Sequence, residues 1–199
     1  MTPSPTAPQA AIEWHRKRLA MPKDEYDALT DEAKKRAFTV AGTAQLDLIA
    51  SVQAALDSAL EQGTDLEAFK AAVGEKLQSE WVGSKGNPAS RLETIFRTNV
   101  QSAYNAGRYA EATDPDTLAM RPYWQFDAVV DGRTTSGCKA ANGVVLPADH
   151  PWWGRNTPPR HFNCRAVFHP LTRRQAAAAG IAPEPPPVSA AEGFGAPPT

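Results

Sequence analysis

Both cysteines of this chain and three of its four histidines lie within positions 138–169. Thiolate and imidazole are groups that Zn²⁺ prefers, so Cys138, His161 and Cys164 form a chemically sensible ligand set for a structural ion. The spacing argues against such a site, because Cys-x-x-Cys is absent and His161-x-x-Cys164 is the only tight pair. We therefore predict two buried, reduced thiols that lie near each other, with no cofactor. A zinc site and a disulfide are the alternatives.

A polar stripe on the helix predicted after Ser90 is a second candidate site. Its members are spaced four, three and four residues apart and so share one helix face: Arg97, Gln101, Tyr104 and Arg108. Two arginines beside an amide and a phenol could bind a phosphate or a carboxylate. A solvated or purely structural face is the alternative. We predict the structural role, in which Arg97 and Arg108 bind loops that contain Asp131 or residues 158–164.

The segment Asp131-Gly-Arg133-Thr-Thr-Ser-Gly-Cys138 is the third candidate. Its residue types suit a tight turn in which Arg133 pairs with Asp127 or Asp131. Catalysis there would need a neighbouring base or metal. The sequence also lacks a nucleotide-binding glycine loop, a nucleophile elbow, a His-Glu-x-x-His helix and a paired-carboxylate motif. We predict a structural turn and no enzymatic activity.

The first half of the chain is predicted to be helical, because apolar residues within 11–82 recur with the period of a helix. Between 43 and 62, apolar residues recur at steps of three and four and form one buried stripe. Gly63 is expected to end that helix, and Thr64-Asp-Leu-Glu67 is predicted to be a capping box for the next. Gly83, Gly86 and Pro88 then predict a linker.

A long helix is predicted to follow this linker. Ser90-Arg-Leu-Glu93 has the pattern of a second capping box, and the helix is expected to end near Ala112. Beyond it, aromatic and β-branched residues favour short strands at 123–130, 143–146 and 165–168. Trp152 and Trp153 should supply much of a small core between the loops. The predicted fold class is α+β, with a helical N-terminal half followed by a long helix and a small, irregular, β-containing module.

Composition and charge limit the function classes. The 21 Lys+Arg and 22 Asp+Glu give a net charge of −1, which excludes a histone-like protein that coats nucleic acid by charge. Residues 121–174 carry 8 Lys+Arg against 3 Asp+Glu, or +5, so a contact with a polyanion would lie there. No run of 18 apolar residues and no secretory signal occurs, and two cysteines suit a reducing compartment. We expect no membrane contact.

The ends of the chain are rich in Pro and Ala and are predicted not to pack. The expected organisation is a flexible arm, a helical region, the β-containing module and a flexible Ala/Pro-rich tail, at 1–10, 11–82, 90–170 and 171–199.

Four motifs in a fixed order add a resemblance to a known family. They are Arg97-Thr98, Ala103-Tyr104-Asn105-x-Gly107-Arg108, Asp131-x-Arg133-Thr134 and Pro158-Pro159-x-His161-x-Asn163-Cys164-Arg165. In this order they resemble the phage Mu F-like family of head-morphogenesis proteins, which are minor capsid proteins of tailed bacteriophages and prophages. The resemblance covers roughly residues 11–170. Two departures are Cys138, where many relatives have His, and Ala166, where they have a second Cys.

The resemblance implies a minor capsid protein that docks to the portal and acts in procapsid assembly and in DNA packaging or delivery. Other capsid or scaffold proteins, and packaged DNA, would be further partners. The protein would lie in the virion, inside the phage head, after assembly in the host cytoplasm. The motif residues would then have structural or binding roles: Arg97, Tyr104, Asn105, Arg108, Asp131, Arg133, His161, Asn163, Cys164 and Arg165.

Two other functions are alternatives to this one. A small metal-dependent DNA-processing enzyme would need Asp131, Arg133, His161 and Cys164 to converge on an open cleft. A nonspecific DNA-binding adaptor would need the cations of 121–174 on one exposed face, with binding that weakens as salt rises.

Overall fold

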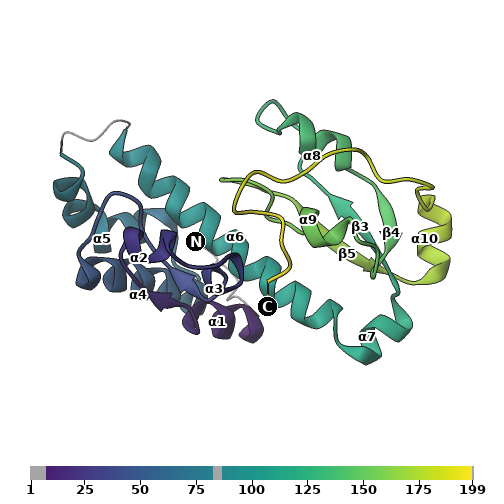
Figure 1. Ribbon diagram of the computed structural model, residues 1–199, viewed down its shortest axis with the longest axis horizontal. Helices are drawn as coiled ribbons and strands as arrows, with labels where there is room; N and C mark the ends of the chain where they lie inside the picture. Colours follow the sequence, from purple (N-terminus) through teal and green to yellow (C-terminus); the bar gives the residue numbers. More distant parts are fainter. Residues whose placement is uncertain (1–7, 83–86, 199) are drawn as a thin grey trace. The chain divides into compact units, whose positions relative to one another are not determined.

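The computed structural model describes residues 8–82 and 87–198, and the chain forms two compact units that meet in the sequence at Gly107 and Arg108 (Figure 1). Most of the predicted arm (1–10) and the glycines of the predicted linker lie outside the described residues. Pro88 of that linker is the first residue of a helix. The α+β class predicted from the sequence is confirmed. Within the described ranges, no helix is long and apolar enough to cross a membrane.

Unit 1 is mainly helical, with one small parallel sheet that the sequence did not predict. Its elements are α1 (Gln9–Arg16), β1 (Leu19–Ala20), α2 (Lys23–Asp27), α3 (Asp31–Lys34), β2 (Ala37–Phe38), α4 (Leu46–Gln62), α5 (Leu66–Glu80) and most of α6 (Pro88–Ala112).

The predicted stripe on α4 is buried from Ile49 to Leu60 and packs against α5 and α6, whereas its first predicted member, Leu46, is 50% exposed. The core that results contains Phe38, Val40, Ile49, Val52, Leu56, Phe69, Val73, Leu77, Trp81 and Leu92. Gly63 ends α4 as predicted, at φ 66°, in the left-handed region that favours glycine. A smaller cluster joins α1, α4 and α6, where Ala11, Ile12, Leu60 and Ala103 are buried.

Both predicted capping boxes are wrong in their cap residue. Asp65, not Thr64, caps α5, and its side chain accepts a hydrogen bond from the Ala68 N–H at 3.0 Å. Asn87, not Ser90, precedes α6 and accepts from the Ala89 N–H at 2.8 Å. Asp and Asn are as competent as Ser and Thr at this position, so a neighbouring candidate displaced the predicted one. The end of α6 at Ala112 is as predicted.

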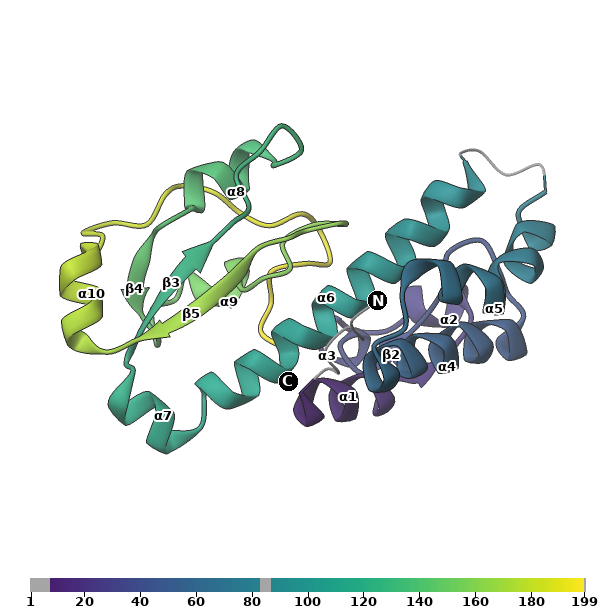
Figure 2. The same cartoon turned by 180° about the vertical axis from the view of Figure 1, so that it is seen from behind.

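Unit 2 is built on a three-stranded antiparallel sheet in the order β4-β3-β5 (Figures 1 and 2). The strands are β3 (Tyr123–Asp127), β4 (Val145–Pro147) and β5 (Val167–Leu171), close to the three predicted ones. Trp124 of the central strand lies opposite Leu146 and Pro170. The short helices of the unit are α7 (Pro115–Met120), α8 (Ser136–Ala141), α9 (Trp153–Asn156) and α10 (Arg173–Ala179).

Aromatic rings form the core of unit 2. The rings of Trp124 and Phe168 are 4.6 Å apart between centroids, and Trp153 lies edge-on to Trp124 at 5.4 Å. Trp152 and Phe126 also pack edge to face. The predicted contribution of the two adjacent tryptophans, Trp152 and Trp153, is confirmed.

The predicted tail contains a helix, α10, which begins with a capping box between Thr172 and Gln175. After α10 the chain runs back along unit 2, as both ribbon views show. Its hydrogen bonds include those of the Ala191 N–H to Arg160 O at 2.9 Å and of the Thr157 N–H to Gly195 O at 2.9 Å. The composition predicts a free tether here, whereas the structure places it against the module.

Candidate functional site

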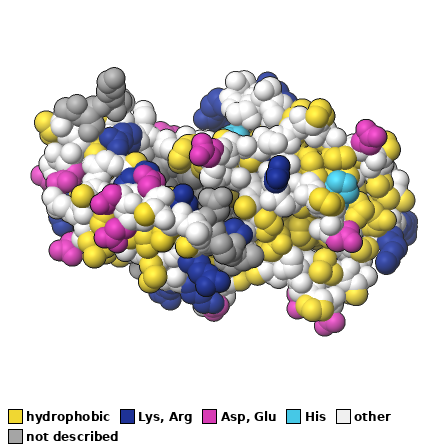
Figure 3. Space-filling model, in the orientation of Figure 1, with side chains coloured by type: hydrophobic (Ala, Val, Ile, Leu, Met, Phe, Trp, Pro, Cys, Tyr) yellow, Lys and Arg dark blue, Asp and Glu magenta, His cyan; other side chains and the backbone are white. Residues whose placement is uncertain are grey.

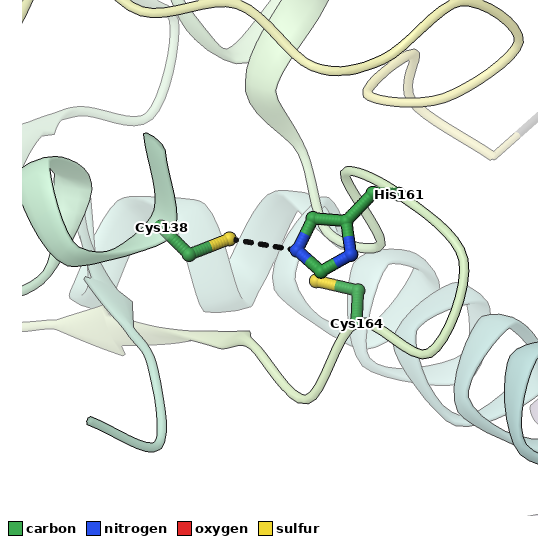
Figure 4. Close-up of side chains that lie close together, drawn as sticks. All are labelled: Cys138, His161 and Cys164. Carbon is green, nitrogen blue, oxygen red and sulfur yellow. Dashed lines mark hydrogen bonds between the residues drawn. The ribbon is translucent and has the colours of Figure 1, made fainter. Parts of the chain in front are cut away.

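Two segments of unit 2 bring Cys138, His161 and Cys164 together (Figure 4). Cys138 lies in the first turn of α8, which the Thr135 side chain caps by accepting from the Cys138 N–H. His161 and Cys164 lie in the loop before β5, where the Cys164 N–H donates to His161 O at 3.2 Å. Asn163 between them has φ 56°, a left-handed conformation that Asn tolerates. This turn directs both side chains towards Cys138.

The side chains are in direct contact. Sγ of Cys138 lies 3.3 Å from Nε2 of His161, and Thr135 Oγ1 lies 3.2 Å from the same nitrogen. Nδ1 of His161 donates to Phe162 O at 2.8 Å. Both sulfurs and Nε2 lie within 4.8 Å of one another. The two cysteines therefore lie near each other, as predicted. Both are buried, and both are free thiols.

The pKa values of the two thiols shift in opposite directions because the thiols are hydrogen-bonded to each other. A hydrogen bond from Cys164, the largest cause, and another from Thr135 lower the pKa of Cys138. The same hydrogen bond and burial raise the pKa of Cys164. Cys138 is therefore the sulfur that ionises first. Thiolate and imidazole in contact can bind a soft metal ion or activate a nucleophile.

An ion pair fixes the loop that precedes α8. Both oxygens of Asp131 accept from the Arg165 guanidinium, at 2.6 and 2.7 Å, and Oδ1 also accepts from the Arg133 N–H at 2.8 Å. These bonds hold the pKa of the Asp131 carboxyl well below its usual range. The prediction that the Arg133 side chain pairs with Asp127 or Asp131 is wrong, since Arg165 reaches Asp131 and Asp127 contacts His169.

Arg160 is a buried residue that the sequence analysis missed. Its side chain donates to Gly137 O at 2.8 Å and lies over the rings of Phe126 and Trp152. It thereby joins the first turn of α8 to the loop that carries His161. Arginine is usually exposed, so only its position beside His161 in the fourth motif could have indicated this role.

A small cleft opens beside Cys138 and His161. Its other lining residues are Ala128, Val129, Arg133, Thr134, Asn163, Arg165 and Ala166. The cleft thus gathers Arg133, His161, Asn163 and Arg165, while the carboxylate of Asp131 is bound to Arg165.

The residues of the polar stripe of α6 are divided between the two units. Arg97 pairs with Glu93 on its own helix at 2.8 Å. Asp131 is bound by Arg165, which belongs to the same unit. Asn105 is buried, and burial raises the pKa of Tyr104. Arg97, Tyr104 and Asn105 belong to unit 1, and Arg108 is the first residue of unit 2.

Comparison with known proteins identifies the class of protein. The family model described as Phage Mu protein F like protein matches residues 50–169, so the chain belongs to this family of phage proteins. It is 33% identical over 162 residues to the "Putative capsid assembly protein F" of Escherichia phage Mu, a match that covers 74% of this chain. It is 31% identical over 161 residues to the "Mu-like prophage FluMu F protein" of Haemophilus influenzae, covering 76%.

The matches cover 36% and 38% of these relatives, so the chain spans little more than a third of their length. No solved structure matches the chain. The name of the phage Mu relative describes a capsid assembly protein.

Proposed function

We propose that this chain is a minor capsid protein that docks to the phage portal and acts in procapsid assembly and in DNA packaging or delivery. It would be made and assembled in the host cytoplasm and remain in the head of the virion. The observation that carries the proposal is the similarity to the capsid assembly protein F of phage Mu across 74% of the chain. The four motifs named above all lie within the matched residues 50–169.

The surface of unit 2 supports a docking role. Hydrophobic side chains gather on the face of this unit in Figure 3. The loop between β3 and α8 exposes two adjacent valines, Val129 and Val130, at 51% and 58%. Phe162, beside the candidate site, is 66% exposed and packs edge-on to Phe194. Apolar groups of this kind suit burial against another protein.

Co-expression with the portal protein of the same phage tests the proposal. A tagged portal protein should retain the full-length chain through affinity purification and gel filtration. Val130→Asp should weaken retention, because it places a charge in the apolar loop. Val82→Asp is the matched control, since Val82 is also exposed, at 83%, but lies in unit 1. Failure of the wild-type chain to bind the portal and to enter heads would refute the proposal.

A DNA contact would belong to the same role. Of the 8 cations in 121–174, Arg160 is buried and Arg165 is bound to Asp131, which leaves the others for phosphates. Binding should then weaken with salt, with a slope of about −0.9 per phosphate contacted. A Lys139→Ala variant should lower that slope by about one unit if Lys139 contacts a phosphate.

The alternative of a metal-dependent DNA-processing enzyme is favoured only by the contact between Cys138 and His161 at the cleft. It predicts cleavage of DNA in Mg²⁺ or Zn²⁺ that Asp131→Ala abolishes. Uncut DNA under these conditions supports the assembly role.

A further inference from the structure

We propose that Cys138, His161 and Cys164 bind one Zn²⁺ ion, which fastens α8 to the loop before β5. The fourth ligand would be a water molecule in the adjoining cleft. The site is independent of the assembly role, because it follows from side-chain geometry within unit 2.

The positions of the three ligand atoms fit a tetrahedral ion. With Zn–S of about 2.3 Å and Zn–N of about 2.0 Å, neighbouring ligand atoms in such a site are roughly 3.5–3.8 Å apart. Here Cys138 Sγ and His161 Nε2 are 3.3 Å apart, and the three atoms lie within 4.8 Å of one another. Small side-chain rotations would therefore admit the ion.

The imidazole presents the nitrogen that a metal needs. Because Nδ1 of His161 faces the carbonyl oxygen of Phe162 at 2.8 Å, Nδ1 carries the proton. In the neutral ring, Nε2 then has a free lone pair, and it is Nε2 that points at Cys138. A backbone carbonyl that fixes the tautomer of a histidine ligand in this way is a common feature of zinc sites.

The backbone supports the second sulfur. The N–H groups of Arg160 and Ala166 both hydrogen-bond to the Cys164 side chain. Such donors stabilise negative charge on sulfur, as a metal-bound thiolate requires. The left-handed turn at Asn163 sets His161 and Cys164 on the same side of the loop.

Burial favours a ligand role over a reactive one. Cys138 and Cys164 are each only 3% exposed, whereas nucleophilic and redox-sensing cysteines are partly accessible. The cleft reaches Cys138 and His161, so solvent can complete the coordination without exposing the sulfurs.

Metal content and cobalt spectroscopy test the site. The full-length chain, purified without chelator under reducing conditions, should contain one Zn²⁺ per chain. Replacement by Co²⁺ should give the charge-transfer bands of thiolate-bound cobalt. Cys138→Ser, Cys164→Ser and His161→Gln should each weaken metal binding by more than the roughly 100-fold that loss of a second-shell partner costs. His169→Gln is the matched control, because His169 is exposed on β5 and lies outside the cluster.

A positioning variant tests the geometry without removing a ligand. Asn163→Val disfavours the left-handed turn and should weaken Co²⁺ binding by about 10- to 100-fold. If a ligand variant does not fold, alkylation of the wild-type chain tests whether its cysteines bind the metal. Bound metal should slow the alkylation of both cysteines by iodoacetamide beyond the slowing that burial alone gives, and a chelator should raise the rate to that of the metal-free chain. A reduced wild-type chain that takes up neither Zn²⁺ nor Co²⁺, or ligand variants that bind as tightly as the wild type, would overturn the proposal.

Discussion

Gly107, in the second family motif, lies where α6 passes against α1, and substituting it should destabilise unit 1. A Cβ atom at this position would lie 3.0 Å from the Ala11 backbone nitrogen and 3.1 Å from the Ala11 Cβ. Ala11 is completely buried, and its N–H already donates to Pro8 O in the first turn of α1. The backbone of α1 therefore has little freedom to move away.

The expected size of the effect follows from two opposed contributions. Replacing glycine by alanine inside a helix ordinarily stabilises the helix by about 1 kcal/mol. Overpacking against a fixed neighbour costs about 1–3 kcal/mol. Gly107→Ala should thus lower the free energy of unfolding by about 1 kcal/mol, which corresponds to a Tm lower by roughly 2–4 °C in a chain of this length. Gly107→Val should lower the free energy of unfolding further.

Gly74→Ala on α5 is the matched control. A Cβ there would meet the Leu92 side chain at 3.4 Å, which is ordinary contact, so the substitution should stabilise the chain by about 0.5–1 kcal/mol. Thermal melts followed by far-UV circular dichroism should separate the two variants in opposite directions. In a double-mutant cycle, Ala11→Gly should destabilise the Gly107→Ala protein less than it destabilises the wild type, because it removes one of the crowded atoms. A Gly107→Ala protein as stable as the Gly74→Ala protein would refute the steric explanation.

Three further expectations concern unit 2. Phe168→Ala should lower the free energy of unfolding by about 3–5 kcal/mol in denaturant titrations, since Phe168 is fully buried among the tryptophans. Arg165→Gln should raise the pKa of Asp131 towards its ordinary value of about 3.9 in an NMR titration. In the wild type, the stabilisation from the pair should be present above that value and lost as the pH falls below it. Truncation after residue 189 should lower stability by about 1–3 kcal/mol, because Thr157 and Arg160 lose backbone partners; an unchanged Tm would mean a free tether.

The sequence predicted helices and strands correctly where a long periodic pattern of apolar residues, or a backbone conformation that favours glycine, determines them. The apolar stripe of α4 and the left-handed Gly63 are examples, and so are the aromatic strands around Trp124. The caps of α5 and α6 were misplaced because several competent residues stand side by side, and only the path of the chain selects one.

The candidate site was predictable in its members but not in its pairing. Chemistry alone indicated Cys138, His161 and Cys164, and the structure brings their ligand atoms together. Arg165 rather than Arg133 binds Asp131, although Arg133 is only two residues away, because side-chain reach across the fold decides such pairs. The buried Arg160 carries no periodic signal, so a sequence assigns it to the surface by default.

The two cysteines lie within the segment that separates the central strand of unit 2, β3, from its last strand, β5, and Cys164 is near the end of that segment. Asp127 of β3 pairs with Val167 of β5, so 40 residues of chain must fold back before these strands meet. A bridge between Cys138 and Cys164 would reduce the effective separation to about 14 residues, which shortens the search for a non-local pairing. Closing a loop of about 26 residues also lowers the entropy of the unfolded chain, worth between about 3 and 4 kcal/mol. A link between Cys138 and Cys164 would therefore act before the native sheet forms, because it would keep the segments of β3 and β5 close together in the unfolded chain.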